Sequence, residues 1–206
     1  MSPRAPDPGA LDVLRRVRGA GSLAEVGRAA EQCRACPDLA DSRSSVVVGD
    51  FPPVARLMLV GEAPGAHEDI AGRPFVGKAG QLLDRMLADA GLDRTEVAVA
   101  NVLKCRPPGN RTPSAVEANR CRGWLDRQVE LVDPEVVVTL GGAALAWALG
   151  RGALLRDARR HVHDWNGRRL LATYHPSAAL RFGPAGAPMA ALREDLRRAA
   201  ELLCGK

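Results

Sequence analysis

The chain has 206 residues, of which 46% are hydrophobic and 26% charged, and its formal net charge is +5. This composition is typical of a globular protein and excludes wholesale disorder. No apolar run approaches the ~20 residues that a membrane span requires. Arg15, Arg16 and Arg18 stand where a secretory signal would need apolar residues, so we expect a cytoplasmic protein. The basic excess permits a polyanionic partner without requiring one.

The first 32 residues are expected to form a partly flexible extension of a single domain that comprises residues 1–206. Pro3, Pro6, Pro8 and Gly9 predict a frayed or loosely docked leader over residues 1–10. Apolar residues at helical spacing predict a helix over Leu11–Arg18, and a capping box at Ser22 predicts a second helix running toward Cys33.

From residue 54 onward, short apolar runs alternate with helical patterns. Four runs, mostly β-branched or leucine-rich, predict strands that are covered on both faces: Arg56–Val60, Val97–Asn101, Val136–Leu140 and Arg169–Thr173. Four helices are predicted between and after them: Gly77–Ala90, Ser114–Val132, Gly142–Leu149 and Met189–Leu203. This alternation predicts a three-layer α/β/α fold with a central, mainly parallel, four-stranded sheet. The polar, turn-rich residues 37–53 predict a loop or a short edge strand.

A polar or glycine-rich segment follows each predicted strand. These segments are Gly61–Gly65, Asn101–Cys105, Gly141–Gly142 and His175–Ser177. Ligands of open parallel sheets bind beyond the carboxyl ends of the strands, so we expect the functional site there. The first segment matches neither a phosphate-binding loop nor a dinucleotide fingerprint, which disfavours nucleotide hydrolysis and dinucleotide binding.

Several side chains on these segments are candidates for chemistry. Glu62 and Glu68 can stabilise a cationic transition state or position water, as in glycosyl transfer; surface charge and helix capping are the alternative. His175 is a candidate hydrogen-bond donor or acid, with a structural hydrogen bond as an alternative of similar weight. Phe75, flanked by turn formers, predicts stacking on a planar ligand, or else a simple loop anchor.

Four of the five cysteines have the pattern of a metal site. Cys33 and Cys36 form a Cys-x-x-Cys hook, and two distant thiols, Cys105 and Cys121, can complete a four-sulfur site. In a reducing compartment, metal binding or chemistry is expected rather than disulfide formation. Inert buried thiols are the alternative, and the spacing leaves zinc and an iron–sulfur cluster both open. Cys204 is not expected to be a ligand.

The motifs occur together in one order. The first is Gly61-Glu-Ala-Pro-Gly-Ala-His-Glu-Asp69, followed by Gly72-Arg-Pro-Phe-Val-Gly-Lys-Ala-Gly-Gln-Leu-Leu83. Then come Asn101-Val-Leu-Lys-Cys-Arg-Pro-Pro-Gly-Asn-Arg-Thr-Pro113 and Tyr174-His-Pro-Ser177. With the four cysteines, they resemble the iron–sulfur uracil-DNA glycosylases, family four of their superfamily, over residues 33–200.

The resemblance implies a [4Fe-4S] cluster on Cys33, Cys36, Cys105 and Cys121. It implies that uracil-containing DNA is the partner and that the N-glycosidic bond of uracil is hydrolysed, which releases the base and leaves an abasic site. The base would flip into a pocket at the carboxyl ends of the strands. We expect a monomer. A related branch bonds to DNA through a histidine in an inserted basic loop, which this chain lacks.

The resemblance also implies roles for individual residues. The catalytic positions are Glu62, Glu68 and His175, and the base-binding positions are Gly61, Ala63, Phe75, Asn101 and His175. An asparagine amide suits O4 and N3–H of uracil, whereas cytosine presents the reverse pattern. His175 would donate to O2 as negative charge develops on the leaving base. Ala63 stands where other branches carry a water-activating aspartate.

Positions in or beside the motif loops are expected to contact DNA. Those expected to hold phosphates are Arg73, Lys78, Lys104, Arg106, Arg111 and Arg181. Ser177 is expected to contact the DNA, and Leu180 to fill the gap in the base stack. Two alternatives stay open: a metal-stabilised nucleic-acid-binding module without catalysis, and a glycosylase that accepts a broader range of deaminated bases.

Overall fold

The computed structural model describes residues 7–205, and the described chain begins with three helices. They are α1 (Pro8–Arg18), α2 (Leu23–Glu31) and α3 (Pro37–Ser42). The Asp7 carboxylate caps α1 by accepting from the backbone N–H of Ala10. The helix thus begins at Pro8 rather than at Leu11, so residues 8–10 are helical and not part of a frayed or loosely docked leader. The prediction for residues 1–6 lies outside the described residues. Helix α3 replaces part of the loop predicted over 37–53; Pro37 at its first turn has a φ suited to a helix start.

Within residues 7–205, five strands form one sheet in the order β2-β1-β3-β5-β4. They are β1 (Leu57–Gly61), β2 (Val97–Asn101), β3 (Val136–Leu140), β4 (His163–Trp165) and β5 (Arg168–Thr173). The four predicted strands pair in parallel, which confirms the α/β class. The described sheet has one strand more than the four predicted: β4 is a short polar strand that forms an antiparallel hairpin with β5. Asn166 and Gly167 make the two-residue turn with φ of 51° and 75°, as a type I′ hairpin requires.

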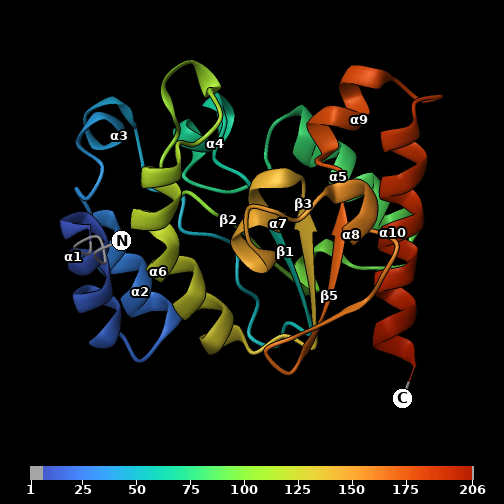
Figure 1. Ribbon diagram of the computed structural model, residues 1–206, viewed down its shortest axis with the longest axis horizontal. Coiled ribbons are helices and arrows are strands. Elements are labelled where there is room, and N and C mark those ends of the chain that lie inside the picture. Colours follow the sequence, from blue (N-terminus) through green and yellow to red (C-terminus); the bar gives the residue numbers. More distant parts are fainter. Residues whose placement is uncertain (1–6, 206) are drawn as a thin grey trace.

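Helices cover both faces of the sheet (Figure 1). Beyond α3 the helices are α4 (Ala66–Ala71), α5 (Lys78–Asp89), α6 (Ala115–Val132), α7 (Gly142–Leu149), α8 (Leu155–Ala158), α9 (Pro176–Phe182) and α10 (Ala187–Cys204), with 3₁₀ turns η1 (Arg94–Glu96) and η2 (Pro108–Asn110). One face packs against α5, α9 and α10, and the other packs against α6 and α7. Helices α1 and α2 lie on α6. The predicted capping boxes at Ser22 and Ser114 are both confirmed.

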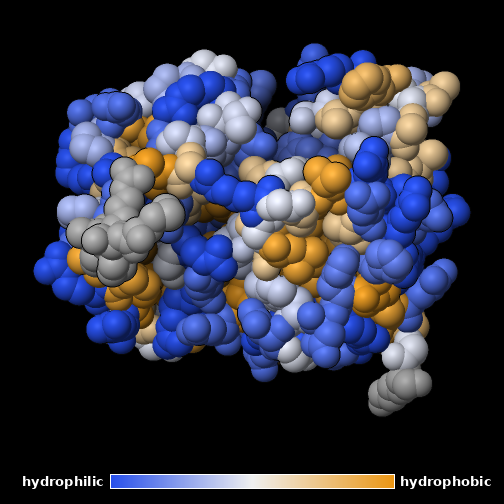
Figure 2. Space-filling model, viewed as in Figure 1, coloured by the Kyte–Doolittle hydropathy of each residue, from blue (hydrophilic) through white to orange (hydrophobic). Residues whose placement is uncertain are grey.

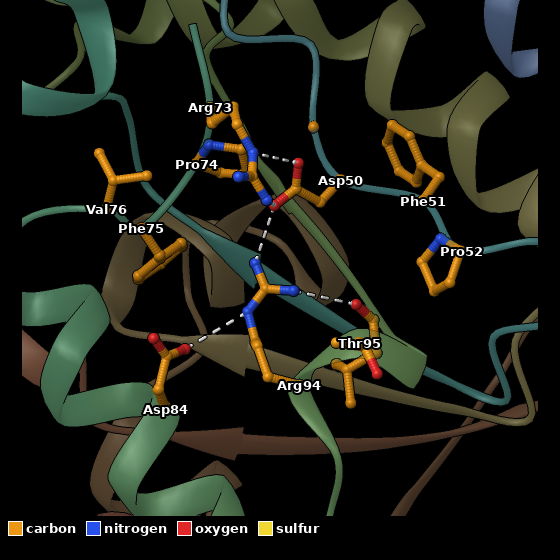
Figure 3. A pocket seen from close by; sticks show the side chains of 12 residues that line it. Asp50, Phe51, Pro52, Arg73, Pro74, Phe75, Val76, Asp84, Arg94 and Thr95 are labelled. Carbon is orange, nitrogen blue, oxygen red and sulfur yellow. Dashed lines mark hydrogen bonds and ion pairs between the residues drawn. The ribbon is translucent and has the colours of Figure 1, made fainter. Parts of the chain in front are cut away.

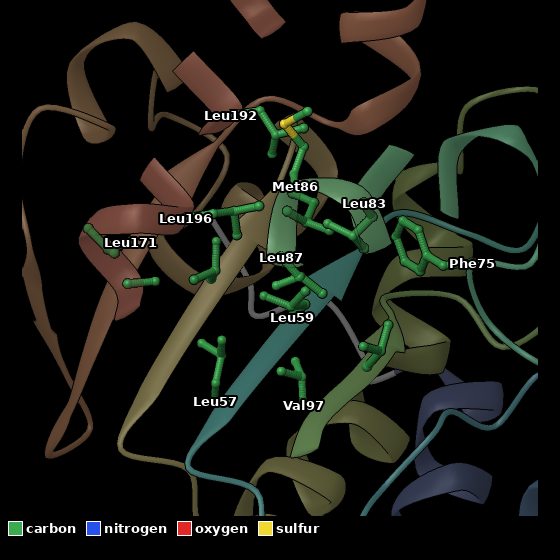
Figure 4. Close-up of a cluster of buried hydrophobic side chains, with 14 of the residues drawn as sticks. Leu57, Leu59, Phe75, Leu83, Met86, Leu87, Val97, Leu171, Leu192 and Leu196 are labelled. Atoms are coloured by element: carbon green, nitrogen blue, oxygen red, sulfur yellow. The ribbon is translucent and has the colours of Figure 1, made fainter. Parts of the chain in front are cut away.

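The core follows the two-residue period of the strands. In β1, Leu57 and Leu59 face α5 and α10, while Met58 and Val60 face α6 and α7. Every residue of β1 is buried, as expected of a strand covered on both sides. Figure 4 shows the first of these clusters, in which leucines of α5 and α10 pack over the sheet and Phe75 lies at one end.

The parallel strands end at the same edge of the sheet. Gly61 and Asn101, the last residues of β1 and β2, are direct partners in the ladder, and Leu140 of β3 pairs with Thr173 of β5. The segments that follow these strands therefore gather at one edge. At the open side of β2, Asp50 adds only an isolated antiparallel bridge to the sheet. Among the described residues, none of the helices has the length and apolar character needed to cross a membrane.

Candidate active site

A cavity of about 220 Å³ lies at the carboxyl edge of the sheet. Its lining residues are Glu62, Ala63, Pro64, Gly65, Glu68, Phe75, Ala79, Asn101, Pro107, Asn110, Arg111, His175 and Ser177. The structure thus brings together every residue predicted to act on or bind the base, apart from Gly61, which lies directly behind the cavity. In Figure 2 the outline of the molecule is notched at the top, between the side that carries α4 and the side that carries α9.

The cavity contains a buried polar atom without a hydrogen-bond partner among the described residues, the side-chain oxygen of Asn101. Asn101 is 2% exposed, and the atom without a partner is its Oδ1. Gly61 makes room for it, because a Cβ at this position would lie 2.3 Å from Asn101 Oδ1 and 2.6 Å from Cζ of Phe75. A buried polar atom without a partner is costly and rare, so this oxygen is available for a ligand.

Phe75 forms an apolar wall of the cavity. Its ring is 7% exposed, packs on one side against the hydrophobic cluster of α5 and α10, and lies 5.6 Å from the His175 ring, centroid to centroid. Its backbone has φ of +55°, which is uncommon for a bulky residue. Gly80 of α5 allows the loop to approach, since a Cβ there would lie 1.7 Å from the Phe75 carbonyl oxygen. The loop is therefore held in a strained conformation that presents one face of the ring to the cavity.

His175 lies at the start of α9. Its Nδ1 accepts a hydrogen bond from the backbone N–H of Ser177 at 3.2 Å and lies 2.8 Å from Ser177 Oγ. Burial lowers the pKa of His175 to about 4, and the nearby Glu68 carboxylate opposes this shift. The imidazole is therefore neutral at pH 7, and because Nδ1 accepts, its proton is on Nε2.

Glu62 and Glu68 differ in what their carboxylates contact. Glu68 accepts backbone N–H bonds from Gly65, Val76 and Gly77 at 2.8–3.1 Å, so its carboxylate joins the glycine turn to the Phe75 loop. The Glu62 carboxylate has no hydrogen-bond or ion-pair partner among residues 7–205, and burial raises its pKa. A partly desolvated carboxylate with a raised pKa is better suited to act as a base than one already engaged by three donors.

The basic residues predicted to contact DNA separate into exposed and buried groups. Those with exposed side chains are Arg73, Lys78, Arg111 and Arg181; Arg106 is half-buried and donates to Asn110. Arg111 pairs bidentately with Glu117 at the cavity rim. The prediction that Lys104 contacts a phosphate is wrong. Lys104 is 1% exposed, and its ammonium donates hydrogen bonds inside the protein, so it does not reach a phosphate. Ser177 and Leu180 are exposed on α9.

A larger cavity of about 600 Å³ lies on the other side of the Phe75 loop (Figure 3). Its charged side chains are paired with one another. Asp50 accepts from Arg73 at 3.2 Å and from Arg94 at 3.1 Å, and Arg94 also lies 3.4 Å from Asp84. These charged side chains neutralise one another and leave no unpaired charge for a ligand in the described lining. The smaller cavity is the candidate site, because the Asn101 side-chain oxygen and the Glu62 carboxylate in it have no partner among the described residues.

The four predicted ligand cysteines line one small cavity between α2, α3, the segment after β2 and α6. Its lining residues are Cys33, Ala35, Cys36, Leu39, Arg43, Leu103, Cys105, Arg120 and Cys121. All five cysteines are free; the fifth, Cys204, lies apart from this cavity and is exposed at the end of α10. Within residues 7–205, no group of three or more His, Cys, Asp or Glu side chains is arranged to hold a single metal ion.

Hydrogen-bond donors surround these sulfurs. Arg43 Nη1 lies 2.9 Å from Cys105 Sγ, and the backbone N–H of Lys104 lies 3.3 Å from Cys121 Sγ. Burial raises the pKa of Cys36 to about 11 and that of Cys121 to about 12 in the absence of metal. Donors directed at sulfur are the usual environment of metal-bound thiolates, so the residues present fit a thiolate-ligated group.

Two residues near the cysteine site were not predicted. Arg43 donates to a cysteine sulfur, and Gln128 accepts from Lys104. Neither lies in a motif with a chemical signature. Asp69 ends the first motif, and its buried carboxylate accepts from the backbone of Ser44 and Ser45. The Cys-x-x-Cys hook and the glycine turn indicated the region, but not the contacts that these residues make across the fold.

Comparison with known proteins agrees with this geometry. The model of the uracil DNA glycosylase superfamily matches residues 48–197, more than half of the chain, and the chain belongs to that superfamily. It is 42% identical over 158 residues to the type-4 uracil-DNA glycosylase of Thermotoga maritima, which covers 76% of this chain and 82% of that protein. The type-4 enzyme of Archaeoglobus fulgidus is 39% identical over 197 residues, 90% of this chain and 94% of that protein. A type-5 uracil-DNA glycosylase of Mycobacterium leprae is 33% identical over 229 aligned positions, 91% of this chain and 98% of that protein.

Proposed function

We propose that this protein is a uracil-DNA glycosylase, which hydrolyses the bond between uracil and deoxyribose in DNA, releases free uracil and leaves an abasic site. The observation that carries the proposal is the buried, unpartnered Oδ1 of Asn101, in a cavity that also presents an aromatic ring and a neutral histidine. Membership of the uracil DNA glycosylase superfamily supports it.

Base recognition in this proposal depends on the Asn101 amide. Oδ1 accepts from N3–H of uracil and the amide nitrogen donates to O4. Cytosine carries an acceptor at N3 and a donor at N4, so it would leave the same amide with two mismatched contacts. Phe75 stacks on the flipped base, and Gly61 and Ala63 leave room for the base at the end of β1.

His175 acts on the leaving group. As the C1′–N1 bond breaks, negative charge develops on the uracil ring and its O2, and Nε2–H of His175 donates to that oxygen. The neutral imidazole stabilises this charge without transferring its proton. Ser177 is a positioning residue here, because its bond to Nδ1 fixes the tautomer and the direction of the ring.

Glu62 acts on the sugar and the water. The sugar becomes oxocarbenium-like, water attacks C1′, and the uracil anion departs with the electron pair of the broken bond. We assign the Glu62 carboxylate to stabilising this cation and to taking the proton of the attacking water. Glu62 would thus do the work of the water-activating aspartate that other branches carry at the position of Ala63. Glu68, predicted as catalytic, is proposed instead as the positioning residue that holds Gly65 and the Phe75 loop.

Cys33, Cys36, Cys105 and Cys121 are proposed to hold a [4Fe-4S] cluster. When bound, the cluster acts as a structural cross-link between thiolates rather than as a redox group of the reaction. The four thiols line a single cavity and include the Cys-x-x-Cys hook, which supports this ligand set. Arg43 is proposed to stabilise the thiolate of Cys105.

The proposed partner is uracil-containing DNA, bound by a protein monomer in the cytoplasm, where its thiols stay reduced. Basic side chains in or beside the motif loops would hold the phosphates: the exposed Arg73, Lys78, Arg111 and Arg181, and the half-buried Arg106. Ser177 would contact the strand, and Leu180, 41% exposed on α9, would fill the space left by the flipped base. Residues 1–206 are proposed to act as one domain, with α1 and α2 docked on α6.

The direct test is an abasic-site assay on matched duplexes. Iron-loaded protein is incubated with oligonucleotides that differ only in one base: uracil, thymine, cytosine, hypoxanthine or xanthine. Alkali-labile cleavage at uracil alone supports the proposal, and cleavage at the deaminated purines as well would extend its range. Tight DNA binding without cleavage at any base would overturn it and favour the non-catalytic alternative.

A further inference from the structure

Lys104 is a buried cation that the proposed reaction does not use. Its side chain is 1% exposed, and Nζ donates to the backbone carbonyl of Asn101 at 2.8 Å and to Oε1 of Gln128 at 2.6 Å. No carboxylate among residues 7–205 forms an ion pair with it. Removing an ammonium group from water is costly unless it has a specific partner, so this arrangement calls for an explanation.

The backbone of Lys104 is tied to the cysteine site. Its N–H lies 3.3 Å from Cys121 Sγ, its carbonyl accepts from the N–H of Val47 at 2.8 Å, and Cys105 is the next residue. Gln128 belongs to α6, the helix that also carries Cys121. One residue therefore joins two cysteine ligands, α6 and the end of β2.

We propose that Lys104 is a positioning residue, which fixes the base-reading Asn101 by holding its carbonyl and joins it to the cysteine ligands. This role rests on the proposed function, in which Asn101 reads uracil. Asn101 is the last residue of β2, so the direction of its side chain depends on what holds the chain at that point. Lys104 supplies that hold from within the protein, and Gln128 in turn is anchored by its own donation to the carbonyl of Val48 at 3.0 Å.

The geometry distinguishes this role from a general contribution to stability. If Lys104 acts through Asn101, its loss weakens uracil binding only while the Asn101 amide is present. A hydrogen bond from a charged donor corresponds to about a tenfold change in an equilibrium constant. The expected loss is therefore about tenfold in uracil affinity for Lys104→Met, with no further loss when Asn101 has already been replaced.

The experiment is a double-mutant cycle on the iron-loaded protein with Lys104→Met, Asn101→Ala and the combined variant. The readouts are the dissociation constant of free uracil by NMR titration, the rate of uracil release, and the iron content with its visible absorption. Leu145→Ala is the control, since it opens the core at α7 away from both sites and should lower the Tm without changing uracil affinity. Additive losses in the cycle, or unchanged uracil affinity in iron-loaded Lys104→Met, would overturn the inference.

Gln128→Met keeps the inference testable if Lys104→Met does not fold or does not bind iron. It removes one acceptor of the ammonium and leaves the bond to Asn101, so a two- to threefold loss of uracil affinity is expected; an unchanged affinity would overturn the inference. A wild-type protein that releases no uracil would overturn the proposed function and this inference together. An active wild type beside an unaffected Lys104→Met would overturn only the inference.

Discussion

Ser177 donates its backbone N–H to Nδ1 of His175 at 3.2 Å, so the side chain of the residue that precedes α9 caps that helix. The contact requires Nδ1 to be an acceptor, which leaves Nε2 as the donor toward the cavity. The positive end of the helix dipole also disfavours an imidazolium at this place. Local helix capping and the proposed chemistry thus depend on the same protonation state of one side chain.

The first prediction concerns pH. Burial lowers the pKa of His175 from 6.5 to about 4, so the active neutral form persists through the range from pH 5 to 8. We expect His175 to cause no inflection of kcat/KM near pH 6.5 and to lower it only toward pH 4. A fall that begins at higher pH belongs to Glu62, because burial raises the pKa of that carboxylate. Between pH 6.5 and pH 4, the unfolded chain binds a proton at His175 more readily than the folded chain does. Burial of His175 therefore makes the folded state less stable as the pH falls through this range. NMR titration of the labelled imidazole measures the pKa, and a midpoint near 6.5 would contradict the assignment.

The second prediction concerns the space behind the base. A methyl group at Gly61 would meet Asn101 Oδ1 and the Phe75 ring, so Gly61→Ala displaces both groups that hold uracil. A displacement of this size costs about 10²-fold in kcat/KM. Gly152→Ala is the matched control, because a Cβ there has nothing within 4 Å. Comparable activity of the two variants in single-turnover assays would show that Gly61 does not shape the site.

The third prediction separates the two glutamates. Glu62→Gln should lower kcat by about 10²-fold or more with little change in uracil affinity or Tm, because the carboxylate has no hydrogen-bond or ion-pair partner in the described part of the chain. Glu68→Ala should lower the Tm and weaken uracil binding, because it releases the backbone N–H groups of Gly65, Val76 and Gly77. Rates, uracil affinity and thermal unfolding of both variants test this division. The reverse pattern would exchange the two roles.

The fourth prediction concerns the cluster. Cys121 is buried in the shared cavity, while Cys204 is exposed near the end of α10. Cys121→Ser should lose iron and the visible absorption and should have a lower Tm. Cys204→Ser should keep the iron content, the visible absorption and the Tm of the wild type. Iron and zinc analysis of both proteins also decides the metal. A colourless, zinc-loaded wild type would refute the iron–sulfur assignment.

The main strands and long helices were predictable because their signals are local. The runs that became β1, β2 and β3 are apolar except for Asn101 at the end of β2 and Thr139 in β3, and every residue in them is buried. β4 was missed because a polar three-residue strand has no such signal and depends on pairing with β5. Helix α3 was missed for a related reason, since six residues are too few for a clear helical period.

The site was predictable as a region but not in its contacts. The motif segments indicated which residues gather at the strand ends, and the structure brings them together around one cavity. The motifs did not indicate which of the charged side chains are buried. Lys104 stands between a motif asparagine and a motif cysteine, and the sequence does not distinguish an ammonium that reaches a phosphate from one enclosed by α6.

The most direct test of hydrolytic uracil release is product identification from a single duplex. Iron-loaded protein acts on a duplex with one uracil, and mass spectrometry follows the free base, the DNA strand and the intact protein. We expect one free uracil per duplex, a strand with one abasic site and a protein of unchanged mass. Absence of free uracil, or a protein–DNA adduct as the end product, would contradict it.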